Sequence, residues 1–252
     1  MACDLYSMFN SPEELFLYLA GELERYSKLP NKQHISLSGG TTPKAFFSFI
    51  VASKFKDTIN WSNLNFWWGD ERCVEFTDEQ SNYGEAKRLL FDHINIPSEN
   101  IHFLPLDLEN SIEDYHVVAE AYACKMKQEM PIENNYPIYD WIILGVGTDG
   151  HTASLFPNEY ELQETATAIC VLKPNTNEFR VTITANTISS AKRVSYLVTG
   201  SSKARVIADI LLQHNAYKSY PAYMIKSKTG KTEYLLDAGA GLFLTANEGN
   251  QS

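Results

Sequence analysis

Residues 141–151 read WIILGVGTDGH, and this stretch is the strongest indicator of the architecture. The run from Trp141 to Leu144 is apolar at every position and ends in glycines. Strands buried on both faces of a parallel sheet have this composition, because helices cover both sides of such a sheet. The stretch therefore predicts a buried strand at 141–144 whose carboxyl end opens into a glycine-rich loop.

Further strands and helices alternate along the chain around this run. Residues 194–198 repeat the apolar pattern and end in Thr199-Gly200, before an expected helix at 201–212. The other expected strands are 34–37, 64–68, 165–171, 179–184 and 233–236. Two of the other expected helices begin at the Ser11 cap, with Pro12 in the first turn, and near Pro43. A third spans 82–93, a fourth begins at Ser111, and a short one spans 237–240. Such alternation predicts an α/β fold with helices on both faces of a mostly parallel sheet.

The composition narrows the possible partners. The chain has 252 residues, 44% of them hydrophobic, and its 21 Lys and Arg against 31 Asp and Glu give a net charge of −10. Nucleic acids and anionic membranes attract basic faces, so neither is an expected partner. A small anionic substrate would require positive charge to be concentrated locally. No repeat or linker divides the sequence, which favours a single domain over residues 1–252.

The cysteines and the hydropathy of the chain indicate its compartment. Cysteines at 3, 73, 124 and 170 form no Cys-x-x-Cys pair, and no histidine lies at zinc-ligand spacing from them. A disulfide framework is not expected at this density, which favours the reducing cytoplasm. Residues 1–10 lack the basic and apolar regions of a signal peptide. No apolar run approaches the ~18 residues that a membrane span needs.

Two loops that follow expected strands have the residues of an anion site. In open parallel sheets the ligand lies beyond the carboxyl ends of the strands. Residues 38–44 read SGGTTPK, where glycines allow close approach and hydroxyls and helix-start N–H groups favour a phosphate. Residues 69–72 read GDER, where Arg72 is suited to a bidentate phosphate contact and Asp70 and Glu71 to orienting it or transferring protons. Taken singly, residues 38–44 are as typical of an ordinary strand-to-helix turn as of an anion site, and residues 69–72 are more typical of a surface ion pair.

A third loop, residues 145–154, carries a candidate general base. It contains His151, which is suited to proton transfer near neutral pH, and Asp149, which is suited to orienting that ring. Glycine N–H groups of the loop would then stabilise an oxyanion. The glycines approximate G-x-G-x-x-G, but no acidic residue follows on a suitable strand, so a dinucleotide site is disfavoured. A lone histidine is otherwise more often structural.

A fourth loop adds positive charge to the same edge of the sheet. Residues 199–204 read TGSSKA, which places Lys203 at an expected helix start, where it would strengthen an anion site. Arg180, near the start of the expected strand at 179–184, is a third candidate cation. By itself, Lys203 would be interpreted as a solvated helix residue.

At these intervals the motifs resemble those of the 6-phosphogluconolactonase family, which is related to glucosamine-6-phosphate deaminase. The resemblance covers about residues 5–243. Its most specific stretches are LSGGTTPK at 37–44, GDER at 69–72, SNYG at 81–84, GTDGHTASLFP at 147–157, RVTIT at 180–184 and TGSSKA at 199–204. It implies a three-layer α/β/α fold of the NagB/RpiA-like type, with a mostly parallel Rossmann-like sheet and a small additional β region.

The resemblance also implies an activity, the hydrolysis of a phosphorylated sugar lactone in the oxidative pentose phosphate pathway, without a metal or cofactor. His151 corresponds to the base that activates water, with Asp149 beside it. Arg72 and Lys203 correspond to the phosphate-holding residues, assisted by Arg180. The other implied substrate-binding residues are Ser38, Gly39, Gly40, Thr41, Thr42, Asp70 and Gly147. The expected partner is a small phosphorylated lactone, bound by a monomer or a weak homo-oligomer.

Two other functions stay open at this point. One is a glucosamine-6-phosphate deaminase or isomerase. Related deaminases place a glutamate where this chain has Phe156, and deamination needs that extra proton-transfer group, so Phe156 argues against it. The other is a non-catalytic sugar-phosphate sensor. Sensors usually carry a DNA-binding or partner module, for which the sequence shows no spare segment, and its negative charge opposes DNA.

Overall fold

A six-stranded parallel sheet forms the centre of the computed structural model, which describes residues 5–104, 106 and 112–245. The strand order is β1-β11-β10-β7-β2-β3, and every neighbouring pair is parallel. The strands are β1 (Tyr6–Phe9), β2 (Gln33–Leu37), β3 (Leu64–Trp68), β7 (Trp141–Leu144), β10 (Arg193–Val198) and β11 (Lys231–Asp237). The predicted strand at 141–144 is β7, which lies between β10 and β2 and is buried at all four positions.

A second, antiparallel sheet of three strands supplies the small additional β region. Its order is β4 (Asp70–Arg72), β9 (Phe179–Ile183) and β8 (Ala168–Leu172). A separate hairpin joins β5 (Ile132–Glu133) to β6 (Tyr136–Pro137). The sequence interpretation of residues 69–72 as a loop is wrong, because residues 70–72 pair with β9 as a strand. Three consecutive charged residues lack the apolar alternation of a strand, and the contacts that hold them come from elsewhere in the chain.

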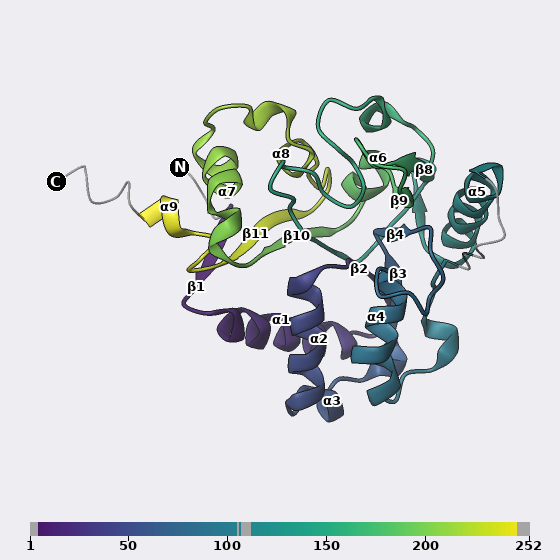
Figure 1. Cartoon of the computed structure of the whole chain (residues 1–252). Helices are drawn as coiled ribbons and strands as arrows, with labels where there is room; N and C mark the ends of the chain where they lie inside the picture. The colour runs from purple at the N-terminus through teal and green to yellow at the C-terminus, as the bar shows by residue number, and fades with distance from the viewer. Residues whose placement is uncertain (1–4, 105, 107–111, 246–252) are drawn as a thin grey trace.

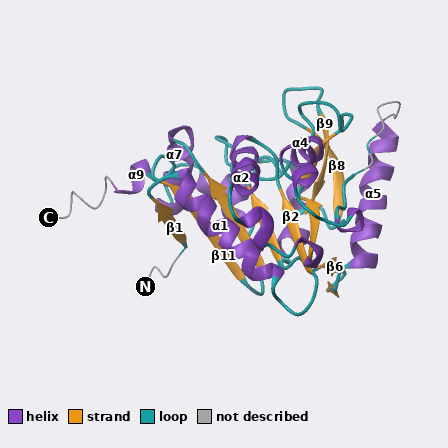
Figure 2. Cartoon of the chain, turned by 90° about the horizontal axis from the view of Figure 1, so that it is seen from below, coloured by secondary structure: helices purple, strands orange, loops and turns teal. Residues whose placement is uncertain are grey.

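Helices cover both faces of the parallel sheet, which gives three layers. On one side lie α1 (Pro12–Ser27), α2 (Thr41–Ala52), α3 (Phe55–Thr58) and α4 (Asn82–Leu89), as Figure 1 shows. On the other side lie α6 (Ala185–Ser189), α7 (Ala204–Leu212) and α8 (Pro221–Met224), while α9 (Leu242–Thr245) follows β11 near the C-terminus (Figure 1). In Figure 2, α5 (Ile112–Glu129) runs beside the second sheet, where it packs on β8 and β9.

The predicted starts of α1, α2, α4 and α7 differ from the observed ones by at most a turn. The Ser11 cap is confirmed, since its hydroxyl accepts a hydrogen bond from the Glu14 amide at 3.3 Å and Pro12 opens α1. Helix α2 begins at Thr41 rather than Pro43, and a short 3-10 turn precedes α7. The predicted short helix at 237–240 is wrong, because Asp237 ends β11 and α9 begins later. The expected cap at Ser111 lies outside the described residues.

Strand β1 is not predicted from the sequence. This strand lies at the edge of the six-stranded sheet and pairs with β11 on one side only. Three of its four residues are exposed, Tyr6 and Met8 among them. An edge strand of this kind needs no apolar face, so hydrophobic patterning cannot detect it.

A buried histidine, His102, packs against strand β3 in the core. His102 is only 2% exposed, and its ring stacks on Trp67 with the ring centroids 3.9 Å apart. Its Nε2 donates to Asn65 Oδ1 at 3.0 Å. Burial lowers the pKa of His102 to about 3, with Lys125 acting in the same direction, and this outweighs the Glu129 carboxylate 3.2 Å from Nδ1. The folded protein therefore holds this ring neutral.

His102 should make the stability of the fold depend on pH. The pKa of His102 is lower in the folded protein than the unfolded value of 6.5. At a pH between about 3 and 6.5, the unfolded chain therefore binds a proton at His102 and the folded chain does not. The stabilisation is complete above 6.5 and is lost as the pH falls toward 3. The free energy of unfolding, measured with urea, should fall between neutral pH and two pH units below 6.5. This fall should be about 2–3 kcal/mol larger in the wild type than in His102→Gln. His93→Gln, which replaces an exposed histidine, is the matched control; an unchanged pH response of His102→Gln would contradict the assignment.

Candidate active site

A pocket opens at the carboxyl ends of the parallel strands, where the loops after β2, β7 and β10 meet strand β4. Its volume is about 250 Å³. Eleven of the twelve residues predicted for the site line it: Ser38, Gly39, Gly40, Thr41, Thr42, Asp70, Arg72, Gly147, His151, Arg180 and Lys203. The twelfth, Asp149, does not line the pocket but bonds to Nδ1 of His151. Asn82, Thr199 and Ser202, which the sequence did not single out for the site, also line it.

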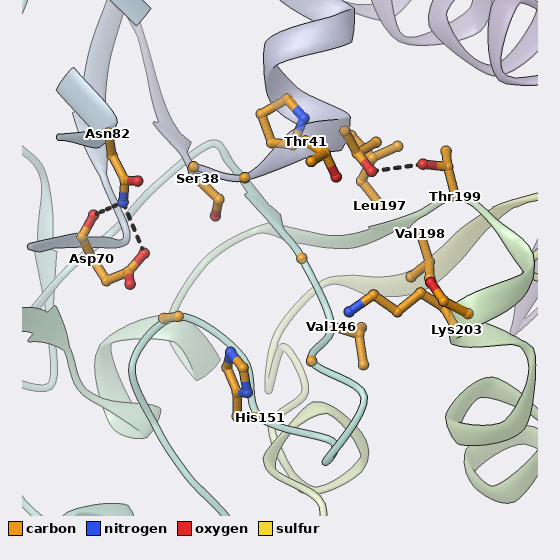
Figure 3. A pocket seen from close by; sticks show the side chains of 18 of the residues that line it. Ser38, Thr41, Asp70, Asn82, Val146, His151, Leu197, Val198, Thr199 and Lys203 are labelled. Carbon is orange, nitrogen blue, oxygen red and sulfur yellow. Dashed lines mark hydrogen bonds between the residues drawn. The ribbon is translucent and has the colours of Figure 1, made fainter. Parts of the chain in front are cut away.

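His151 and Asp149 form a dyad at the pocket wall. His151 Nδ1 lies 2.6 Å from Asp149 Oδ1, and the His151 backbone N–H donates to the same oxygen at 3.2 Å. The hydrogen bond from His151 lowers the pKa of Asp149 to about 2, so this carboxylate is charged at neutral pH. With Nδ1 donating to Asp149, Nε2 is the acceptor nitrogen, and the ring faces the pocket in Figure 3.

The loop that carries the dyad is closed by its own hydrogen bonds. The Gly147 amide donates to the His151 carbonyl at 2.8 Å, and the Gly150 amide donates to Gly147 at 3.0 Å. The Thr152 hydroxyl donates to the Gly145 carbonyl at 2.8 Å. A Cβ at Gly147 would lie 2.1 Å from His151 Nδ1, so only glycine leaves room for the ring. The expectation that these glycine amides stabilise an oxyanion is therefore wrong for Gly147 and Gly150, because both N–H groups are already bonded.

The anion loop is shaped by Gly40 and the start of α2. Gly40 has a φ of +102°, which suits glycine, and the helix begins at the next residue. The first N–H groups of a helix have no partner within it, so those of Thr41 and Thr42 are available to a ligand. The Thr42 and Thr199 hydroxyls lie 2.6 Å apart and join this loop to the one after β10 (Figure 3). The Ser38 hydroxyl donates to the Ile143 carbonyl at 2.8 Å, which ties the loop to β7.

The three predicted cations differ in their partners. The ammonium of Lys203 points into the pocket in Figure 3, burial lowers its pKa, and Asp149 opposes that shift. Arg72 donates through Nη1 to the Gln80 carbonyl, and its buried Nε has no partner within the described structure. Arg180 is paired with Glu178 and lies 3.9 Å from an Asp70 oxygen. Positive charge without a carboxylate partner therefore comes from Lys203 and Arg72 more than from Arg180.

Strand β4 separates the roles of Asp70 and Glu71, which the sequence left open. Successive side chains of a strand point to opposite faces. Asp70 faces the pocket and accepts a hydrogen bond from the Ser154 hydroxyl at 2.6 Å. Glu71 points away and accepts from the amides of Arg72, Asn82 and Tyr83 at 2.7–2.8 Å. Burial raises the pKa of Glu71 to about 7 against the effect of these amides, and Glu71 anchors the start of α4 to β4 rather than contacting the ligand.

Other kinds of site are not evident in the part of the chain that is described. Within residues 5–104, 106 and 112–245, no three His, Cys, Asp or Glu side chains are grouped so that they could hold a metal ion. The same residues include no helix with the length and apolar character of a membrane span.

Comparison with known proteins agrees with the geometry. The family model of glucosamine-6-phosphate isomerases/6-phosphogluconolactonase matches residues 11–234. A 6-phosphogluconolactonase of Haemophilus influenzae is 42% identical over 93% of this chain and 97% of its own length. A crystal structure of devB protein superposes with a TM-score of 0.89 at 41% identity, covering 95% of this chain and 98% of that one.

A more distant solved structure has the same fold. The 6-phosphogluconolactonase of Trypanosoma brucei is 26% identical, has a TM-score of 0.83, and covers 96% of this chain and 98% of its own. The family match spans most of the chain, and the relatives match it nearly end to end. The chain therefore belongs to the family of glucosamine-6-phosphate isomerases and 6-phosphogluconolactonases.

Proposed function

We propose that this protein hydrolyses 6-phospho-D-glucono-1,5-lactone to 6-phospho-D-gluconate, a step of the oxidative pentose phosphate pathway. The observation that carries the proposal is the His151–Asp149 dyad, which faces a pocket that also contains the Lys203 ammonium. A general base beside an anion site is what hydrolysis of a phosphorylated lactone needs. The 42% identical relative is a 6-phosphogluconolactonase, which supports the same substrate.

In the proposed mechanism, His151 is the general base. Nε2 takes a proton from a water molecule as the water oxygen bonds to the lactone carbonyl carbon. The bond from that carbon to the ring oxygen then breaks, and the ring oxygen takes the proton back from His151 to become a hydroxyl. Asp149 stays ionised, keeps the Nδ1 proton in place and stabilises the transient imidazolium. The product acid releases its proton to solvent.

The phosphate group is proposed to lie against Lys203, Arg72 and the start of α2. The Lys203 ammonium points into the pocket, and the first N–H groups of α2 add a positive field. Arg180 is assigned to the pocket wall, since Glu178 and Asp70 already balance its charge. This arrangement concentrates positive charge locally in a chain of net charge −10.

Lys203→Gln should separate phosphate binding from chemistry. Charge-assisted hydrogen bonds contribute about 1.5–3 kcal/mol, so we expect KM for the phosphorylated lactone to rise roughly 10–100-fold. Hydrolysis of unphosphorylated glucono-1,5-lactone should change little, because that substrate has no group for Lys203 to hold. Initial rates on both lactones would measure this. Equal losses on the two substrates would assign Lys203 a general structural role instead.

The proposal is tested directly by lactone hydrolysis. The lactone is generated immediately before use, and acid release is followed with a pH indicator against spontaneous hydrolysis. We expect a rate above this background that is proportional to protein concentration. Phe156 is 6% exposed and its ring centroid lies 5.0 Å from that of His151, so no second proton-transfer group stands there for deamination. Ammonia release from glucosamine 6-phosphate, with no lactone hydrolysis, would overturn the proposal.

The proposed location is the cytoplasm. Cys73, Cys124 and Cys170 are free thiols, as is usual in a reducing compartment. The proposed partner is the phosphorylated lactone alone, and the acidic total charge disfavours nucleic acid.

A further inference from the structure

Asn82 is a pocket residue whose side chain is only half satisfied by the protein. It is the first residue of α4 and is 5% exposed. Its Nδ2 donates to the Asp70 carbonyl at 2.8 Å and approaches Asp70 Oδ1 at 3.4 Å. These contacts fix which end of the amide is the nitrogen, and Figure 3 shows the oxygen turned away from Asp70.

The free end of this amide is an acceptor. Asn82 Oδ1 accepts no hydrogen bond from any described residue, although it lies in the pocket wall. It lies over Gly39, where a Cβ would be only 1.7 Å away. This oxygen is open to the pocket rather than fully buried, so a donor on a ligand can take the place of water there. An acceptor left free at the edge of a ligand pocket therefore points to a donor on the ligand.

Asn82 is also held rigidly. Its backbone N–H donates to Glu71 Oε1 at 2.7 Å, and the Ser81 hydroxyl caps the same helix by accepting from the Gly84 amide at 2.9 Å. The nitrogen of the side-chain amide is tethered to β4. The oxygen is thus fixed before a ligand arrives, which is the condition for a selective hydrogen bond.

We propose that Asn82 Oδ1 accepts a hydrogen bond from a ring hydroxyl of the lactone and makes Asn82 a specificity-determining residue. This inference rests on the proposed function. The phosphate and the lactone carbonyl offer only acceptors, which an amide oxygen repels, whereas the hydroxyls on C2, C3 and C4 are donors. The contact favours a lactone that carries this hydroxyl over one in which it is replaced by hydrogen.

The test crosses a variant with altered substrates. kcat/KM is measured for wild type and Asn82→Ala on the parent lactone and on its 2-deoxy, 3-deoxy and 4-deoxy forms. The variant should lose roughly 10–100-fold on the parent lactone. On the one deoxy lactone that lacks the contacted hydroxyl, wild type and variant should react equally. A purely structural role would lower all four rates by the same factor.

A further variant keeps the result interpretable. Ser81→Ala weakens the same helix start, but Ser81 does not line the pocket, so its effect should be equal on all four lactones. If Asn82→Ala folds only in part, the smaller folded fraction lowers all four rates by the same factor, so the ratios among the four lactones still report the contact. Equal losses across the lactones, or no loss on the parent, would overturn the role of Asn82. Failure of the wild type on every lactone would instead overturn the proposed function, and this inference with it.

Discussion

His151→Ala should lower kcat for the phosphorylated lactone by about 10²–10⁴-fold, the usual contribution of a positioned general base. KM should change much less, because Lys203 and the start of α2 are left intact. The cause is the loss of Nε2, the acceptor nitrogen that faces the pocket while Nδ1 is bonded to Asp149 at 2.6 Å. Stopped-flow or indicator assays corrected for spontaneous hydrolysis would measure it.

Asp149→Asn is the matched variant for this result. It keeps the size of the side chain but removes the charge that holds the Nδ1 proton, so it should reduce kcat while leaving the pocket intact. Since the pKa of Asp149 is lowered to about 2, this carboxylate does not titrate in the range of the assay. Near-wild-type hydrolysis by His151→Ala would remove the histidine from the mechanism, whatever the effect of Asp149→Asn.

Gly39→Ala should be the second most damaging change, although it adds a single methyl group. The new Cβ would lie 1.7 Å from Asn82 Oδ1 and 2.3 Å from Asn82 Cγ. Asn82 cannot rotate away without breaking its bond to the Asp70 carbonyl, so the anion loop or β4 must move. We expect a loss of about 1–3 kcal/mol in unfolding free energy and, from misplacement of the site, roughly 100-fold in kcat/KM.

Gly21→Ala provides the control for this glycine substitution. A Cβ at Gly21, in the middle of α1, would meet nothing within 4 Å, so alanine there should stabilise the protein by about 0.5–1 kcal/mol. Combining Gly39→Ala with Asn82→Ala removes the clash and should restore most of the lost stability without restoring activity. Urea unfolding of the single and double variants measures this. A Gly39→Ala protein as stable as the wild type would show that the close approach of Asn82 to Gly39 does not restrict the residue at position 39.

The elements that the sequence predicted well are those with strong local signals. Strand β7 is apolar at every position, and the Ser11 cap with Pro12 fixes the start of α1. The glycine loops could be placed at one edge because parallel strands end at the same side of a sheet. The pocket brings together the loops at 38–42 and 145–151 as this rule predicts.

The elements that were missed depend on contacts distant in sequence. The sequence of strand β4 is charged and resembles a loop. Its carboxylates are stabilised by partners distant in sequence, such as Ser154 and the amides of α4, which the local sequence does not reveal. The pairing of Arg180 with Glu178 could be predicted, because residues two apart in an extended chain lie on one face. Asn82 belongs to the SNYG motif at 81–84, but the sequence does not predict a role for it. Only the folded pocket places its amide oxygen where no protein donor reaches.

The pocket is built across the junction of the two sheets. The dyad and the anion loop follow strands of the six-stranded sheet, whereas Asp70, Arg72 and Arg180 belong to the smaller one. The Ile183 amide joins the two sheets by donating to the Gly69 carbonyl at 2.9 Å. A displacement of the smaller sheet relative to the larger one would take Asp70, Arg72 and Arg180 away from the dyad. Enzymatic activity in this protein therefore requires that the two sheets be docked, and a substitution at their junction should impair it even where the loops of the larger sheet are intact.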